Sequence, residues 1–226
     1  KLHPKQANKK AEKKLKRFKV IETLQGSIQK FEHMLKNNTS SIGIILGARG
    51  KGKSALGMRI LENIHYSTNK RCAAMGFEAK KLPKWIHVVE DIEDVPPESV
   101  VLIDEGGILF SSRESMSNAN KVLSSLLLVA RHKDMSIIFI SQNSSNLELN
   151  AIRQADYILL KPSSLLQQDF ERQKIKQMYE EISDKFEEHE IHRGITYIYS
   201  DVYRGFVTNQ LPSFWSEDVS KAFKKK

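Results

Sequence analysis

The residues with the clearest chemical meaning form the run Gly47-x-x-x-x-Gly52-Lys53-Ser54. Glycines allow consecutive backbone N–H groups to turn inward around an anion, and the start of a following helix adds positive potential there. In such a loop the lysine bridges the outer phosphates of a nucleotide and the serine hydroxyl ligates magnesium. An ordinary glycine-rich turn is the alternative. The pattern predicts a nucleotide-binding loop made of Gly47, Ala48, Arg49, Gly50, Lys51, Gly52, Lys53, Ser54 and Ala55.

Two adjacent acids, Asp104 and Glu105, follow the apolar run of residues 100–103. A pair of carboxylates at the tip of a buried strand is costly unless a cation or a water molecule uses it. We expect Asp104 to hold magnesium through its water shell, together with Ser54. Glu105 would polarise the water that attacks the γ-phosphorus, as a general base. The alternative is that Asp104 and Glu105 are ordinary surface residues. In a chain that also has the glycine-rich loop, however, the pair favours an ATPase over a kinase or a nucleotide-storage protein.

Gln142 and Arg131 are further catalytic candidates. Gln142 follows the apolar run 136–140, where its amide could reach the γ-phosphate or the attacking water; capping of the next turn is the alternative. Arg131 ends a helical stretch at 119–131 and could stabilise transition-state charge on a neighbouring subunit, or merely interact with the helix dipole. Arg113 and Arg153 are alternatives for the same role. The predicted catalytic residues are thus Glu105, Lys53, Gln142, Arg131 and Arg49, of which Arg49 could instead be a solvated loop charge.

The surrounding elements predict an α/β fold. Apolar runs at 41–46, 85–89, 100–103, 136–140 and 157–160 have the length and composition of buried strands, and helical periodicity separates several of them, notably at 55–67. Strands that alternate with helices form a mainly parallel sheet covered on both faces, a three-layer sandwich. The glycine-rich loop would then join a buried strand to the start of a helix.

The two flanks of this core have a different pattern. Apolar residues recur at helical spacing within 7–36 and predict one amphipathic N-terminal helix. After the core, we expect a helix at 165–190, a β-hairpin of strands 195–199 and 203–208, and a last helix at 213–223. The predicted organisation is therefore a basic segment with its helix (1–39), an ATPase core (40–162), and a C-terminal helix, hairpin appendage and basic tail (163–226).

Composition excludes several classes of protein. With 226 residues, 40% of them hydrophobic, the chain can bury one sizeable core, so wholesale disorder and fibrous architecture are excluded. The one cysteine, Cys72, cannot form an internal disulfide, and the histidines do not have the spacing of metal ligands. No apolar run is long enough to span a bilayer. We therefore expect a cytoplasmic protein without stable membrane insertion.

The net charge of +9 is concentrated at the two ends. Residues 1–19 hold nine basic residues against one acid, and four lysines stand among the last six residues. Such ends suit a phosphate backbone or an anionic surface, because binding releases counterions without any need to read a sequence. A solvated tail that aids solubility is an equal alternative.

Taken in order, the loop at 47–54, the pair at 104–105, the Ala130-Arg131-His132 helix end and the strand that ends Ile140-Ser141-Gln142 resemble the FtsK–HerA branch of the P-loop ATPases. This ASCE-type branch, with its catalytic glutamate, includes viral genome-packaging ATPases and zonula-occludens-toxin-like proteins. The sequence of the glycine-rich loop is also similar to that of packaging ATPases of small tailed phages. In those ATPases, arginines at the Arg49 and Arg131 positions are implicated in catalysis.

The resemblance implies a motor that uses ATP and Mg²⁺ to move double-stranded DNA, bound without regard to sequence. It implies a ring-shaped homo-oligomer with composite active sites, a viral portal or capsid as docking partner, and a place in the host cytoplasm and transiently at the capsid. Two other functions remain open: a phage assembly or secretion ATPase with protein and membrane partners, and a nucleotide-dependent switch with little turnover.

Overall fold

The computed structural model describes residues 15–104, 116–147, 149–192 and 194–220, with the backbone alone at 116–123 and 165. Its strands form one nine-stranded sheet in the order β1-β9-β8-β7-β2-β6-β5-β3-β4. The strands from β7 to β4 are parallel, and β8, β9 and β1 continue the sheet antiparallel. Their bounds are β1 Lys19–Gly26, β2 Ile42–Leu46, β3 Cys72–Met75, β4 Ile86–Val89, β5 Val100–Asp104, β6 Ser136–Ile140, β7 Tyr157–Leu160, β8 Thr196–Ser200 and β9 Tyr203–Thr208.

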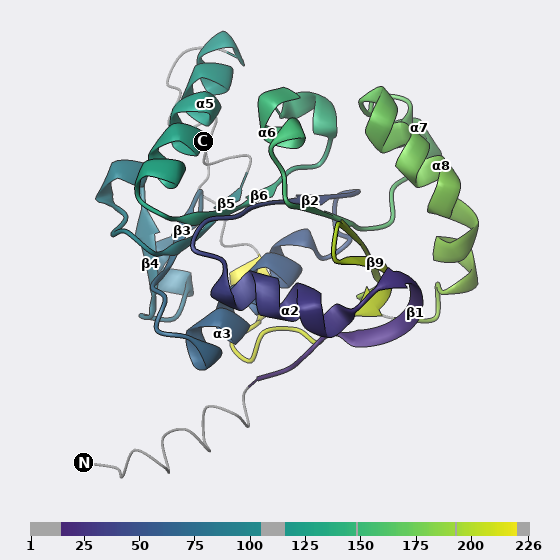
Figure 1. Cartoon of the computed structure of the whole chain (residues 1–226), viewed down its shortest axis with the longest axis horizontal. Coiled ribbons are helices and arrows are strands. Elements are labelled where there is room, and N and C mark those ends of the chain that lie inside the picture. The colour runs from purple at the N-terminus through teal and green to yellow at the C-terminus, as the bar shows by residue number, and fades with distance from the viewer. Residues whose placement is uncertain (1–14, 105–115, 148, 193, 221–226) are drawn as a thin grey trace.

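Helices cover both faces of this sheet (Figure 1). The helices α2 and α3 lie on one face, and α5, α6 and α8 lie on the other. The helices are α2 Ile28–Asn37, α3 Lys53–Ser67, α5 Met116–His132, α6 Leu149–Arg153, α7 Leu165–Gln168, α8 Gln173–Glu188 and α9 Glu217–Ser220, with short 3₁₀ turns at Ala79–Lys81, Ile92–Asp94 and Ser144–Asn146. The predicted three-layer α/β sandwich with a mainly parallel sheet is confirmed.

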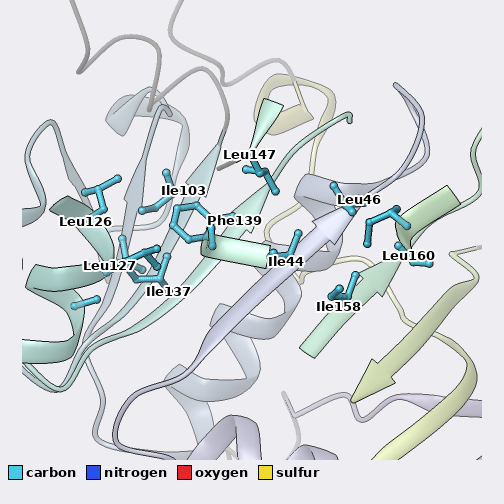
Figure 2. Close-up of a cluster of buried hydrophobic side chains, with 14 of the residues drawn as sticks. Ile44, Leu46, Ile103, Leu126, Leu127, Ile137, Phe139, Leu147, Ile158 and Leu160 are labelled. Carbon is cyan, nitrogen blue, oxygen red and sulfur yellow. The ribbon is translucent and has the colours of Figure 1, made fainter. Parts of the chain in front are cut away.

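The central strands are continuous apolar runs in the sequence because the core buries their side chains on both faces of the sheet. Ile44 and Leu46 of β2 point into the layer beneath α5, α6 and α8, while Ile45 between them points to the layer that holds α3. Figure 2 shows the first layer, where Leu126 of α5 and Phe139 of β6 join them. Each such fully buried side chain contributes about 1.5–3 kcal/mol. The central strands are thereby fixed from both sides.

A glycine sets the distance between α3 and the sheet. A Cβ added at Gly57 would lie 2.5 Å from Cδ1 of Leu102, in the middle of β5. With hydrogen at this position, α3 approaches β5 closely without displacing the Leu102 side chain. The helix that begins at Lys53 is therefore held directly against the strand that ends at Asp104.

The N-terminal prediction was partly wrong. Residues 19–26 form β1, which pairs antiparallel with β9, and the amphipathic helix α2 begins only at Ile28. Gly26, with a φ of 79°, ends the strand, and the Ser27 side chain accepts a hydrogen bond from Lys30 N as the N-cap of α2. Val20, Ile21 and Thr23 are β-branched, which favours the extended conformation. Residues 7–14 lie outside the described chain.

The structure confirms some of the other predicted helices and strands and corrects others. The predicted hairpin is confirmed as β8 and β9, and it extends the central sheet through β7. The stretch predicted as one helix at 165–190 is two helices, α7 and α8, and the last helix is described only as α9. The strand β3 was not predicted, because Cys72–Met75 contains no β-branched residue. The division into three segments at residues 39 and 162 stays a prediction.

In the part of the chain that the structure describes, no helix has the length and apolar character needed to cross a membrane.

Candidate nucleotide-binding site

The glycine-rich loop joins the end of β2 to the start of α3. Its glycines 47, 50 and 52 have φ angles of 142°, 77° and 84°, a region that side chains with a Cβ rarely adopt. A Cβ added at Gly50 or Gly52 would meet nothing within 4 Å, so the backbone there faces open space. The first turn of the 15-residue helix α3 starts at this point. The loop backbone and the amino end of α3 thus border open space, and a helix amino end favours an anion.

Lys53 lies inside the loop. Its side chain is only 8% exposed, and its Nζ donates hydrogen bonds to the carbonyl oxygens of Gly47 at 2.7 Å and Ala48 at 2.9 Å. The loop is also tied to the end of β7, because Ala48 N donates to Pro162 O at 3.1 Å. The ammonium group is therefore held at the loop before any ligand arrives.

A cavity of about 730 Å³ opens beside this loop. Its volume lies within the range of about 300–1,000 Å³ that small-molecule sites occupy. Because β2, β5 and β6 are parallel, their carboxyl ends meet at one edge of the sheet, and the cavity lies there. The residues that line it are Arg49, Gly50, Gly52, Lys53, Ser54, Ala55, Asp104, Ile140, Ser141, Gln142, Leu211, Trp215 and Ser220.

The cavity brings together most of the residues singled out in the sequence. Lys53 and Ser54 reach it from α3, Asp104 from the end of β5, and Gln142 from the end of β6. Arg49 reaches it from the loop. Glu105, the residue after Asp104, and Arg113 lie outside the described residues. Gly47, Ala48 and Lys51 belong to the loop but are not among the described residues that line the cavity.

Magnesium fits the side chains present. The Ser54 hydroxyl and the Asp104 carboxylate are hard oxygen donors, and both face this cavity. Such a pair holds magnesium together with phosphate oxygens and water rather than in an all-protein cage. Elsewhere, too, the described residues contain no group of three or more His, Cys, Asp or Glu side chains that could hold a metal ion.

The segment after Gln142 is bonded to the helices that follow β7. The Gln142 carbonyl accepts a hydrogen bond from Nε2 of Gln167 in α7. Ser144 N donates to the Glu171 carboxylate at 2.7 Å, and burial raises the pKa of that carboxyl. The position of Gln142 at the cavity is therefore coupled to α7 and to the start of α8.

The arginines proposed for a neighbouring site lie elsewhere. Arg131 ends α5, and its guanidinium donates to Oε1 of Gln154 at 3.0 Å; neither it nor Arg153, in the last turn of α6, is among the described residues that line the cavity. Both side chains are exposed. Within one chain, the structure does not bring either arginine to the loop.

Sequence reasoning missed several residues at or near this site. Leu211, Trp215 and Ser220 come from the segment after β9, and no periodic pattern connects them with the loop. Lys161, at the end of β7, is 1% exposed; its Nζ donates to the carbonyl oxygens of Gly194 at 2.8 Å and Ile195 at 3.1 Å. Burial lowers the pKa of Lys161 to about 7. The sequence feature that could have drawn attention to Lys161 is its position directly after the apolar run 157–160.

Comparison with known proteins finds solved structures with a similar fold. No protein-family model matches the chain, and no curated protein matches it. The genome packaging NTPase B204 of Sulfolobus turreted icosahedral virus 2, solved with AMPPCP, is 13% identical with a TM-score of 0.52, over 77% of this chain and 100% of that one. EssC (ATPases 2 and 3) of Geobacillus thermodenitrificans is 13% identical with a TM-score of 0.50, over 80% of this chain and 43% of that one.

A third similar structure is the pCW3 conjugation coupling protein TcpA with ATPγS, 10% identical with a TM-score of 0.50, over 81% of this chain and 65% of that one. At such identities the similarity concerns the fold. The chain therefore has the fold of a P-loop ATPase, similar to a viral genome-packaging NTPase and to FtsK–HerA-like ATPases, as its sequence resemblance implied.

Proposed function

We propose that this chain hydrolyses ATP and uses the energy to move double-stranded DNA, as an oligomeric ring that packages a viral genome. The observation that carries the proposal is the convergence of Lys53, Ser54, Asp104 and Gln142 on one cavity beside the glycine-rich loop. These residues come from the start of α3 and from the ends of β5 and β6, and together they provide the groups that phosphoryl transfer needs.

The loop would bind the triphosphate. Phosphate oxygens would compete with the Gly47 and Ala48 carbonyls for the Lys53 ammonium, and charge-assisted bonds to phosphate are the stronger of the two kinds. Arg49, on the same loop, would add positive charge at the cavity. Ser54 and Asp104 would hold Mg²⁺, which neutralises charge that develops on the phosphate oxygens.

Hydrolysis would depend on two further residues. Glu105 follows Asp104 in the chain and would accept the proton of the attacking water as general base. Gln142, at the neighbouring strand end, would position that water and respond to loss of the γ-phosphate. Its carbonyl bond to Gln167 would transmit the change to α7.

Movement of DNA would need the assembly. Arg131 is exposed at the end of α5, so it is accessible to an adjacent subunit, where it would stabilise the transition state. The basic residues at both ends of the sequence would hold the DNA backbone without reading bases. The similar fold of a genome packaging NTPase supports this reading. The ring would act in the host cytoplasm and dock transiently on a viral portal or capsid.

Steady-state ATP hydrolysis with and without duplex DNA at low salt tests the proposal. We expect DNA to stimulate turnover in the wild-type protein. Lys53→Ala and Glu105→Gln should each lower turnover at least about 100-fold, the typical loss when one transition-state contact is removed. Glu105→Gln should still bind ATP. Lys30→Ala, which removes an exposed lysine of α2, is the matched control and should leave turnover unchanged.

Each contrary result points to a different function. Turnover that duplex DNA does not change would contradict the motor and favour an assembly or secretion ATPase. Tight ATP binding without turnover in the wild-type protein would indicate a nucleotide-dependent switch.

A further inference from the structure

The segment after β9 gives the nucleotide cavity an apolar wall. Leu211 is 59% exposed, although it is a large hydrophobic side chain, and Trp215 is half-buried; both line the cavity that the glycine-rich loop borders. Among the described residues that line it, Trp215 is the one aromatic side chain. Exposed apolar groups that border a polar cavity are typical of a ligand-binding surface.

This wall is fixed to the helix that carries the phosphate-binding residues. Glu62 of α3 is fully buried, and its carboxylate accepts hydrogen bonds from Ser213 N at 3.1 and 3.0 Å and from the Ser213 hydroxyl. The same carboxylate forms an ion pair with the buried Arg59. Residues 211–215 are thus anchored through Glu62 to α3. This point is about two turns after the first turn of the helix, which holds Lys53 and Ser54.

Ring contacts support the same segment from its other side. Phe214 meets the ring of Trp85 edge-on, at 5.7 Å between centroids and an interplanar angle of 81°. Trp85 in turn stacks on His65 of α3, at 4.3 Å. With residue 214 fixed by these contacts, the backbone on either side of it is held while Leu211 and Trp215 border the cavity.

The lining of the cavity combines groups that suit both parts of a nucleotide. The glycine-rich loop, an ammonium group and a carboxylate suit phosphates and their cation. An indole ring and a leucine suit a planar heterocycle. We propose that Trp215 stacks on the base of the bound nucleotide and that Leu211 covers its ribose side, so that the C-terminal segment forms the base-binding wall. This inference rests on the proposed ATP site.

Binding measurements with two ligands test the proposal by calorimetry. The ligands are ATP and inorganic tripolyphosphate, each with Mg²⁺; only ATP has a base. Trp215→Ala should weaken ATP binding about tenfold, in line with losses of base stacking on aromatic side chains, and should leave tripolyphosphate binding unchanged. Trp215→Phe keeps a ring and should retain most of the affinity. Lys53→Ala should weaken binding of both ligands.

A second measurement does not depend on removing Trp215. The chain has two tryptophans, so Trp85→Phe leaves Trp215 as the one fluorophore of its kind. ATP should then change the tryptophan fluorescence, and tripolyphosphate should not. This readout decides the question even if Trp215→Ala fails to fold.

The outcomes separate the two proposals. If the wild-type protein binds neither ligand, the nucleotide site itself is refuted. If it binds both but Trp215→Ala leaves ATP affinity intact, or weakens tripolyphosphate equally, the base-binding wall is refuted while the nucleotide site stands. An unchanged fluorescence signal with ATP in the Trp85→Phe protein would likewise refute the wall.

Discussion

Two glycines of the loop have left-handed φ angles for different reasons. Gly47 lies where a Cβ would come within 2.5 Å of the Lys161 Cβ and 2.8 Å of its carbonyl oxygen. Gly50 faces open space, so its requirement is conformational alone. The first glycine lets the loop touch the end of β7, and the second leaves room for a ligand.

This difference predicts unequal costs of substitution. Gly50→Ala should lower the free energy of unfolding by about 1–2 kcal/mol, the cost of a left-handed conformation for a residue with a Cβ. Gly47→Ala should cost clearly more, because a steric overlap with Lys161 is added to an unfavourable φ. Urea denaturation of the two variants measures this, and equal losses would contradict the close contact.

Lys161 makes stability depend on pH. Burial lowers its pKa from 10.5 to about 7 in the folded protein. Between these values the unfolded chain binds a proton that the folded chain does not, so the free energy of unfolding rises with pH across this window. Below about pH 7 both states are protonated and the dependence ends.

The prediction compares the wild-type protein with Lys161→Met. The stability difference, wild type minus variant, should increase between pH 7 and 9 by up to about 1.4 kcal/mol per pH unit. Chemical denaturation at several pH values checks it, with Lys30→Met as the control for loss of a lysine. A difference that does not vary with pH would show that the buried amine is not neutral.

At this scale, much of the candidate site was predictable from the sequence. Asp104 and Gln142 stand where an apolar run gives way to polar residues, so their place at a strand end could be inferred, and the glycine-rich pattern predicted Lys53 at the start of a helix. Trp215 and Lys161 could not be assigned to the site, because their positions depend on tertiary contacts such as that of Glu62 with Ser213.

At the scale of elements, β1 shows where periodicity fails. Ile21, Leu24 and Ile28 have helical spacing, yet residues 19–26 are a strand. Register shifts between Val20 and Glu22 and between Thr23 and Gln25 interrupt the alternation that would have indicated a strand. The partner strand is about 180 residues away, so local sequence could not reveal the pairing.

The C-terminal segment and α3 form one unit through Glu62. Glu62→Ala should lower the free energy of unfolding by about 3–5 kcal/mol, because it leaves the Arg59 guanidinium buried without its ion-pair partner. Ser213→Ala removes one hydroxyl hydrogen bond and should cost only about 1 kcal/mol.

Urea denaturation gives both values, and limited proteolysis reports the segment directly. The bonds between 209 and 216 should become cleavable in Glu62→Ala at protease concentrations that leave the wild-type protein intact. Equal stability of the two variants would contradict the anchoring role of the carboxylate.

At the scale of the molecule, one sheet runs through all three predicted segments. Residues 19–26, the strands of the predicted core and the hairpin belong to the same nine-stranded sheet. The sequence predicted the parallel strands other than β3, because buried parallel strands are continuous apolar runs, and it indicated the antiparallel part only as a separate hairpin.

The proposed ring predicts complementation between inactive variants. Lys53→Ala lacks a working loop and Arg131→Ala lacks the trans arginine, so each alone should be inactive. In an equal mixture, sites that combine an intact loop with a neighbour's intact Arg131 should restore up to about a quarter of wild-type ATPase activity, as expected for head-to-tail interfaces.

Mixtures with Arg113→Ala or Arg153→Ala in place of Arg131→Ala identify the residue that acts in trans. Native mass spectrometry with a non-hydrolysable ATP analogue checks that mixed oligomers form. Mixed oligomers without restored activity would show that no such residue is shared between subunits.

The pairing of β1 with β9 also has a consequence for biosynthesis. The ribosome makes β1 long before its partner, since about 180 residues separate Thr23 from Tyr203. At translation rates of about 5–20 residues per second, β1 waits roughly 10–40 s with its edge unpaired. The nascent chain must keep this strand from pairing elsewhere until β9 emerges, because this edge of the sheet joins two strands that are far apart in the sequence.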